Sequence, residues 1–176
     1  MIRLIAAFFA LYFVLTGHGQ ARGYQDAATC FTLINEGGDL ESAVIHCTRA
    51  IDSRELRGGD LAPVYYNRGW AHDALGDYRR AVEDYGRALH IRPDYVRAYV
   101  ARGYSFVQLG DLDRAIEDYS RALEVEPDNF EARFNRGLAY EQKGELAQAL
   151  ADYERAQALR PGETRVQNIL KRLQHD

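Results

Sequence analysis

The side chains best suited to catalysis or metal binding in this chain are five histidines and two cysteines. The histidines are dispersed, and they form neither an HExxH motif nor a pair at i,i+4 spacing. The GxSxG and GxGxxG motifs do not occur, and the glycine-rich segment 57–60 leads to no phosphate-binding lysine. Carboxylates are abundant, but they recur at regular positions that fit a solvated helix surface. We therefore expect no enzyme active site, no metal site and no cofactor.

Composition and charge narrow the class of protein further. The chain is 47% hydrophobic and 27% charged with four prolines, which is typical of a folded, helical protein rather than a disordered one. Its net charge is −4, and the two signs are interspersed. Because a phosphate backbone is recognised by a basic stripe, we expect no nucleic-acid partner.

The first 21 residues have the pattern of a secretory signal peptide. Arg3 precedes an apolar run of twelve residues, 4–15, and the small residues Gly19 and Ala21 follow it. The alternative is a retained membrane anchor, but a spanning helix needs about 20 apolar residues. We predict that segment 1–21 is removed and that the mature protein is periplasmic or secreted from a bacterium. No membrane insertion is expected after that cleavage.

A repeat of 34 residues is the strongest pattern in the sequence, and it divides the chain into segments 62–95, 96–129 and 130–163. Such a period indicates stacked copies of one structural unit. The columns that match in all three segments are Gly69, Gly103 and Gly137; Gly76, Gly110 and Gly144; Ala81, Ala115 and Ala149; Tyr85, Tyr119 and Tyr153; Ala88, Ala122 and Ala156; and Pro93, Pro127 and Pro161.

This period, with small, aromatic and proline residues in these columns, resembles the tetratricopeptide repeat family. The resemblance implies an all-α fold, an α-solenoid of helical pairs such as 63–74 and 78–91. Gly76 would end the first helix of the pair, because glycine tolerates a positive φ. Tyr85 would fill the space between helices that approach closely at Gly69. Each pair would cover the apolar face of the one before it, so that the core runs along the stack.

Two less regular segments flank these repeats. Segment 164–176 places Val166, Ile169, Leu170 and Leu173 on one face, so we predict a C-terminal cap helix. Segment 22–61 matches the repeat weakly, and we predict a degenerate helical pair with helices near 24–36 and 40–53, followed by a polar loop.

An arginine of the first helix recurs with an aspartate of the second, as in Arg68 with Asp84. The two side chains either form an ion pair between the helices or are separately solvated. When the N-terminal pair is aligned on the start of its second helix, Cys30 falls in the arginine column and Phe31 in the small-residue column. Cys47 falls in the column of Tyr85, Tyr119 and Tyr153.

The two cysteines would then lie on facing helices. In an exported protein such cysteines form disulfides, so we predict a Cys30–Cys47 bond that stabilises the N-terminal pair by about 3 kcal/mol. Two buried free thiols, or a redox or metal-binding pair, are the alternatives.

In the resembled family, the first helices of successive units line a concave groove that binds peptides. The residues that the resemblance assigns to this groove are Tyr66, Asn67, Trp70, Asp73, Arg97, Val100, Tyr104, Phe134, Asn135 and Leu138. Trp70 and Tyr66 are the expected hot spots, since large aromatic side chains dominate binding energies. The alternative is that some of these side chains only fill the contacts between repeats. Binding of chaperone C-termini is not expected, because Tyr66 and Trp70 replace the lysine and asparagine that such binding uses.

The sequence thus predicts a scaffold that binds a protein or peptide in a concave groove. The alternative function is a structural, self-associating subunit of a cell-envelope assembly.

Overall fold

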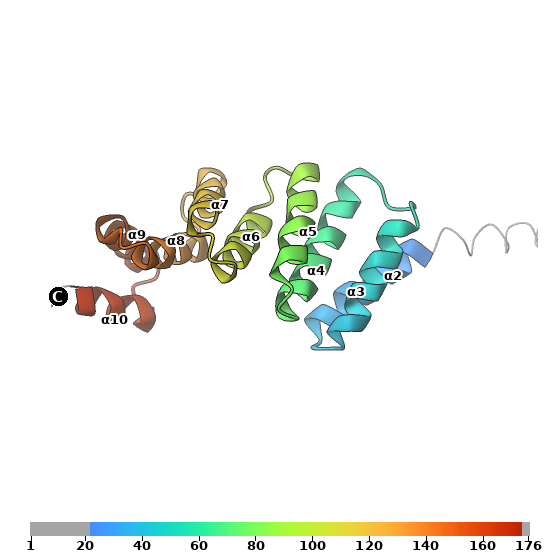
Figure 1. Ribbon diagram of the computed structural model, residues 1–176, viewed down its shortest axis with the longest axis horizontal. Helices are drawn as coiled ribbons and strands as arrows, with labels where there is room; N and C mark the ends of the chain where they lie inside the picture. Colours follow the sequence, from blue (N-terminus) through green and yellow to red (C-terminus); the bar gives the residue numbers. More distant parts are fainter. Residues whose placement is uncertain (1–21, 174–176) are drawn as a thin grey trace, which may run out of the picture.

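The computed structural model describes residues 22–173, so the predicted signal peptide lies outside the described residues. Within residues 22–173 the chain forms nine α-helices, one short 3₁₀ helix and no strand. The helices follow one another in a row from α2 to α10 (Figure 1). The predicted all-α solenoid is confirmed.

The helices pair as predicted, and each pair packs on the next. The four pairs are α2 (Arg22–Asn35) with α3 (Leu40–Asp52), α4 (Leu61–Ala74) with α5 (Tyr78–Ile91), α6 (Val96–Gln108) with α7 (Leu112–Val125), and α8 (Phe130–Gln142) with α9 (Leu146–Leu159). The 3₁₀ helix η1 (Gly58–Asp60) precedes α4, and α10 (Thr164–Leu173) follows α9.

A glycine ends the first helix in the turn of each pair, and a capping side chain starts the second helix in every pair except α8–α9. Gly76 has φ +79°, a left-handed conformation that ends α4, and its equivalents in the two later pairs have φ +78° and +80°. The Asp77 side chain then accepts a hydrogen bond from the backbone N–H of Arg80 in the first turn of α5. The connection is therefore short enough to hold the two helices side by side.

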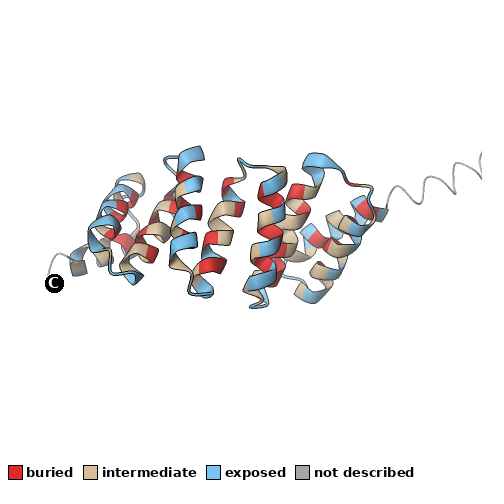
Figure 2. Ribbon diagram, turned by 45° about the horizontal axis from the view of Figure 1, so that its top comes forward, coloured by how far each residue is buried: buried red, intermediate tan, exposed pale blue. Residues whose placement is uncertain are grey.

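Buried residues lie where the helices face one another (Figure 2). The tyrosine that recurs in each repeat is at most 1% exposed, and its ring packs against the recurring glycine of the first helix. The three tyrosines are Tyr85, Tyr119 and Tyr153. A Cβ added at Gly103 would stand 2.7 Å from the ring of Tyr119, so only glycine permits this approach. The repeat columns are thus columns of interhelical contact.

The arginine of each first helix pairs with the aspartate of its own second helix. The Arg68 guanidinium donates to both carboxylate oxygens of Asp84, at 2.7 and 2.8 Å. Arg102 bonds to Asp118 in the same way, and so does Arg136 to Asp152. Of the two alternatives for these side chains, the structure shows the ion pair, and the aspartates are buried.

The same arginine also reaches the preceding pair. Arg68 donates to the Thr48 hydroxyl of α3 at 3.0 Å, and Arg136 donates to the Ser120 hydroxyl of α7 at 2.9 Å. Gly86 of α5 occupies the equivalent position before Arg102, and no hydroxyl is available there. Two of the three arginines therefore tie neighbouring units together.

The N-terminal pair contains the predicted disulfide, with the Cα atoms of Cys30 and Cys47 5.3 Å apart. The column assigned to Cys30 was wrong, however. Gly37 has φ +71° and is the equivalent of Gly76, and it is followed by an extra residue before the capping side chain of Asp39. Cys30 consequently occupies the glycine column of the repeats.

The one-residue shift also moves Phe31 out of the small-residue column. It stands instead in the column of Trp70, and it is 57% exposed. Cys30 and Cys47 thus replace the glycine–tyrosine contact of the regular repeats with a covalent bond.

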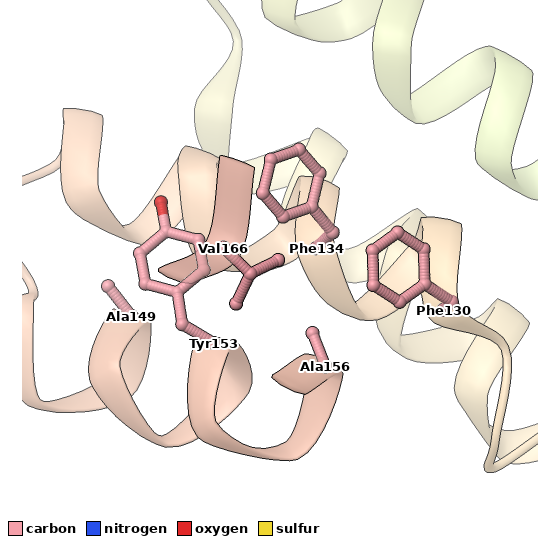
Figure 3. Packing of buried hydrophobic residues seen from close by; sticks show 6 residues of the cluster. All are labelled: Phe130, Phe134, Ala149, Tyr153, Ala156 and Val166. Atoms are coloured by element: carbon pink, nitrogen blue, oxygen red, sulfur yellow. The ribbon is translucent and has the colours of Figure 1, made fainter. Parts of the chain in front are cut away.

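Helix α10 closes the C-terminal end, as predicted. Val166 is fully buried against Phe134 and Tyr153 (Figure 3). Partly buried Ile169, Leu170 and Leu173 join the same cluster. Helix α10 thus takes the place that the first helix of a further repeat would have.

Candidate peptide-binding groove

A groove of about 500 Å³ runs across the first helices α4, α6 and α8. This groove is the candidate functional site. It is lined by Tyr66, Trp70, Asp73, Tyr85, Arg97, Val100, Ala101, Tyr104, Asn129, Glu131 and Asn135.

Most of the residues predicted for the groove are brought together there. Seven of the ten line it, and three do not: Asn67, Phe134 and Leu138. Phe134 is only 7% exposed, because α10 packs over it and the Arg165 guanidinium lies 5.1 Å from its ring centre. Leu138 is partly buried in the same cluster. Helix α10 therefore covers Phe134 and Leu138, which the third repeat was expected to contribute to the groove.

Exposed aromatic rings form the apolar part of the groove. Trp70 is 37% exposed and Tyr104 is 46% exposed, although both lie on helices whose other faces are buried. Tyr66 is less available, since its ring packs 5.7 Å from Tyr85 and 5.1 Å from Tyr95. Trp70 and Tyr104 are thus the side chains with the most free apolar surface in the groove.

Two charges stand at opposite ends of the groove. Arg97, in the first turn of α6, lies over the Tyr66 ring at 5.2 Å. Asp73, in the last turn of α4, accepts a hydrogen bond from the Ser105 hydroxyl at 2.8 Å. Burial raises the pKa of Asp73 to about 6, although hydrogen bonding opposes this rise.

A larger hollow of about 640 Å³ lies where α7 connects to α8. It is lined mainly by residues of the turn, and its charged groups Glu131 and Arg160 pair with each other at 2.8 Å. Because its lining is mainly a turn and has Phe130 as its one aromatic side chain, it is a weaker candidate than the groove.

Sequence reasoning missed Phe31 as a surface residue. In the corrected register, Phe31, Trp70 and Tyr104 share one column, and all three are exposed. An exposed aromatic side chain therefore recurs once per unit in three consecutive first helices. The double glycine of the turn, Gly37-Gly38, was the available signal that the turn is one residue longer.

A sequence profile described as "Tetratricopeptide repeat" matches residues 66–124 and 100–164. Together these matches span more than half of the chain. The protein belongs to the tetratricopeptide repeat family.

Solved structures with the same fold come from several proteins. The structure of MamA residues 41 to the end, from Desulfovibrio magneticus RS-1, has a TM-score of 0.75 at 21% identity, covering 85% of this chain and 81% of that one. The first TPR of Spaghetti (RPAP3), bound to the HSP90 peptide SRMEEVD, has a TM-score of 0.63 at 24% identity, covering 65% and 90%. The Arabidopsis OM64 TPR domain has a TM-score of 0.64 at 25% identity, covering 66% and 97%. No curated protein matches the sequence.

The described part of this TPR protein contains neither a candidate metal-binding cluster nor a candidate membrane-spanning helix. Within residues 22–173, no three His, Cys, Asp or Glu side chains gather in a way that could hold a metal ion. Over the same residues, none of the helices combines the length and the apolar character needed to span a membrane. The family is one of protein-interaction scaffolds, which generally lack catalytic activity.

Proposed function

We propose that this TPR protein is an exported scaffold that binds an extended segment of a partner protein in the groove across α4, α6 and α8. The observation that carries the proposal is the exposure of Trp70 and Tyr104 inside a concave surface, beside the polar side chains of Asp73, Arg97 and Asn135. Apolar rings with a few orienting polar groups are typical of peptide sites. RPAP3, which shares the fold, holds a peptide in its solved structure.

The predicted leader 1–21 and the disulfide support placement outside the cytoplasm, in the periplasm or beyond. The protein would act there by holding its partner rather than by catalysis. Its partner would be a protein segment and not a nucleic acid, because acidic and basic residues are interspersed along a chain of net charge −4 and form no basic stripe in the sequence.

The test is photo-crosslinking in the native envelope. A photoreactive phenylalanine analogue at position 104 should capture a discrete partner, and Trp70→Ala should reduce that capture about tenfold or more, as expected for an aromatic hot spot. The matched control is Ile45→Ala, since Ile45 is 49% exposed but lies on the second helix α3. Circular dichroism should be unchanged in both variants. Equal capture by wild type and Trp70→Ala would refute the groove.

A second candidate is self-association through the C-terminal end. A hollow of about 590 Å³ there is lined by Leu146, Leu150, Leu173 and neighbouring residues, and Leu146 is 53% exposed. Light scattering after size exclusion separates the two functions. A concentration-independent monomer supports the scaffold, and a dimer that Leu146→Glu dissociates supports self-association.

A further inference from the structure

Asp73 is a groove carboxylate without a cation. Its Oδ1 accepts a hydrogen bond from Ser105, and the buried Tyr85 hydroxyl approaches it without completing a regular hydrogen bond. Within residues 22–173, no Arg, Lys or His nitrogen lies within the 4.0 Å of an ion pair with Asp73. Trp70 and Tyr104, both exposed, line the same part of the groove.

The third repeat shows how the same position is satisfied inside the molecule. Glu141 is the equivalent of Asp73, two repeats later, and it accepts a hydrogen bond from the Tyr153 hydroxyl at 2.7 Å. Its counter-ion is Arg172 of the cap helix α10. Counted back by two repeats, Arg172 corresponds to Tyr104. At Asp73, therefore, an aromatic ring stands where Glu141 has an arginine.

The other groove cation is too far along the helices to replace that arginine. Arg97 stands ten positions before the column of Asp73 in the repeat, which is about 15 Å along a helix axis. Its guanidinium lies over Tyr66 instead. The carboxylate of Asp73 is thus partly desolvated and left without an opposite charge.

Such a group lowers the stability of the free protein. Burial raises the pKa of Asp73 from its usual value of 3.8 to about 6, so the folded state binds more protons than the unfolded state between these values. The contribution of Asp73 to stability therefore decreases as the pH rises through that window, and the carboxylate is unfavourable at neutral pH. A cation supplied from outside would remove this penalty.

We propose that Asp73 receives a basic side chain, arginine or lysine, from the partner segment, with Trp70 and Tyr104 as the aromatic walls around its stem. The inference rests on the proposed groove and names the chemistry of its occupant. A guanidinium or ammonium group forms an ion pair with the carboxylate and also makes favourable cation–π contacts with the faces of aromatic rings. Arg172 beside Glu141 is the internal counterpart of this contact.

The experiment uses the full mature protein and two short probes, acetyl-Leu-Arg-Leu amide and the same peptide with citrulline. Citrulline keeps the shape of arginine and removes its charge. Trp70 is the only tryptophan of the chain, so its fluorescence reports binding at this site. We expect the arginine probe to bind about tenfold or more tightly than the citrulline probe, a difference of about 1.4 kcal/mol. A lysine probe should also bind more tightly than a norleucine probe.

Two variants test whether Asp73 is the cause. Asp73→Asn should lower the affinity for the arginine probe to that for the citrulline probe and leave the citrulline affinity unchanged. Tyr104→Arg should place an internal cation as Arg172 does, and it should abolish the preference for arginine. Glu83→Gln is the control, because Glu83 is exposed on the second helix α5 and does not line the groove. Its preference should equal that of the wild type.

The pH dependence gives an independent readout. As the pH falls from about 7.5 to about 5, the arginine preference should decrease because Asp73 becomes protonated. The other titratable groups that face Asp73 are Tyr85 of α5, Tyr104 of α6 and Tyr119 of α7, whose pKa values are all raised, so they stay neutral over this range.

Equal binding of both probes, absence of binding, or tighter binding of a glutamate probe would overturn this inference. Its failure is distinguishable from failure of the groove. If crosslinked capture depends on Trp70 but is unchanged in Asp73→Asn, the groove binds its partner without a basic side chain at this position. If a second copy is the occupant, Asp73→Asn changes sedimentation in the absence of any probe, and the proposal of a separate partner fails.

Discussion

The N-terminal pair and the regular repeats hold the same helical hairpin together by different means. In the regular repeats, a glycine admits the tyrosine ring and a bidentate arginine–aspartate pair joins the two helices. In the N-terminal pair, a disulfide stands in the place of the glycine–tyrosine contact. The polar contact between its helices also places the acidic residue on the first helix, since the Nδ1 atom of His46 in α3 lies 2.6 Å from the Oδ1 atom of Asp26 in α2.

The difference follows from position in the stack. A regular repeat is covered by a neighbour on each side, so packing and a shielded ion pair suffice. The N-terminal pair has a described neighbour on one side alone, the helix α4. A covalent bond stabilises a hairpin without further buried surface, because it restricts the unfolded chain. The N-terminal pair is thus held together by a covalent bond, whereas the regular repeats are held together by packing and an ion pair.

The largest effect is expected from breaking the regular ion pair. Asp84→Ala leaves the Arg68 guanidinium, whose side chain is 12% exposed, without its carboxylate. Removing one partner of a buried pair destabilises by about 3–5 kcal/mol. Urea unfolding followed by circular dichroism measures this change. The neighbouring Glu83→Ala is the control, because Glu83 is exposed, and it should change stability by less than about 0.5 kcal/mol. Equal effects of the two variants would contradict the role of the pair.

A smaller and more local effect is expected from removing the disulfide. The Cys30→Ala, Cys47→Ala double variant should lose about 3 kcal/mol in the N-terminal pair, since the bond closes a loop with a sequence separation of 17. Hydrogen exchange should show faster exchange in α2 and α3, with protection kept in α6 to α9. Uniform loss of protection along the chain would show that the disulfide does not act on the end of the stack alone.

The smallest effect is a gain in stability at Gly86. Gly86→Ser should supply the hydroxyl that Thr48 and Ser120 provide to the other arginines, and a Cβ there would lie 3.5 Å from the Arg102 Nη1 atom without a clash. Together with the better helix propensity of serine, we expect about 1 kcal/mol.

Gly86→Ala separates the two causes of that gain. Helix propensity alone would make the alanine variant more stable than the serine variant by about 0.5 kcal/mol. A serine variant at least as stable as alanine supports the bond to Arg102, and the opposite order would contradict it. Thermal unfolding compares the three proteins.

Much of the fold was predictable because each repeat column makes a local or nearest-neighbour contact. The helices and the turn glycines follow from residue types that recur at a fixed period, and the recurring arginine and aspartate made the ion pair one of two alternatives. The cap helix follows from the apolar face of segment 164–176. The column of Cys30 was predicted wrongly, because the alignment started from Asp39 and counted backwards. The turn contains one extra residue between Gly37 and Asp39, so every residue of the first helix was displaced by one column.

The groove was predictable only as a set of columns. The sequence could not tell that α10 buries Phe134, because that contact joins a cap helix to a repeat whose own columns look regular. Nor could it distinguish Asp73 from Glu141, two acidic residues of one column. Only the packing shows that Arg172 reaches the second and that Tyr104 faces the first.

By itself, then, the sequence determined the stack of helical pairs, since period, turn glycines and apolar columns depend on short-range geometry that any copy of the repeat obeys. It also assigned the columns of the proposed groove, and seven of those ten residues line one concave surface. The tertiary structure decided which side chains of that face are exposed, which charges are paired, and where a disulfide replaces a packed ring. Exposure, charge pairing and disulfide formation depend on the residue that faces a given side chain from the neighbouring helix. The residue type at a single position does not specify that neighbour.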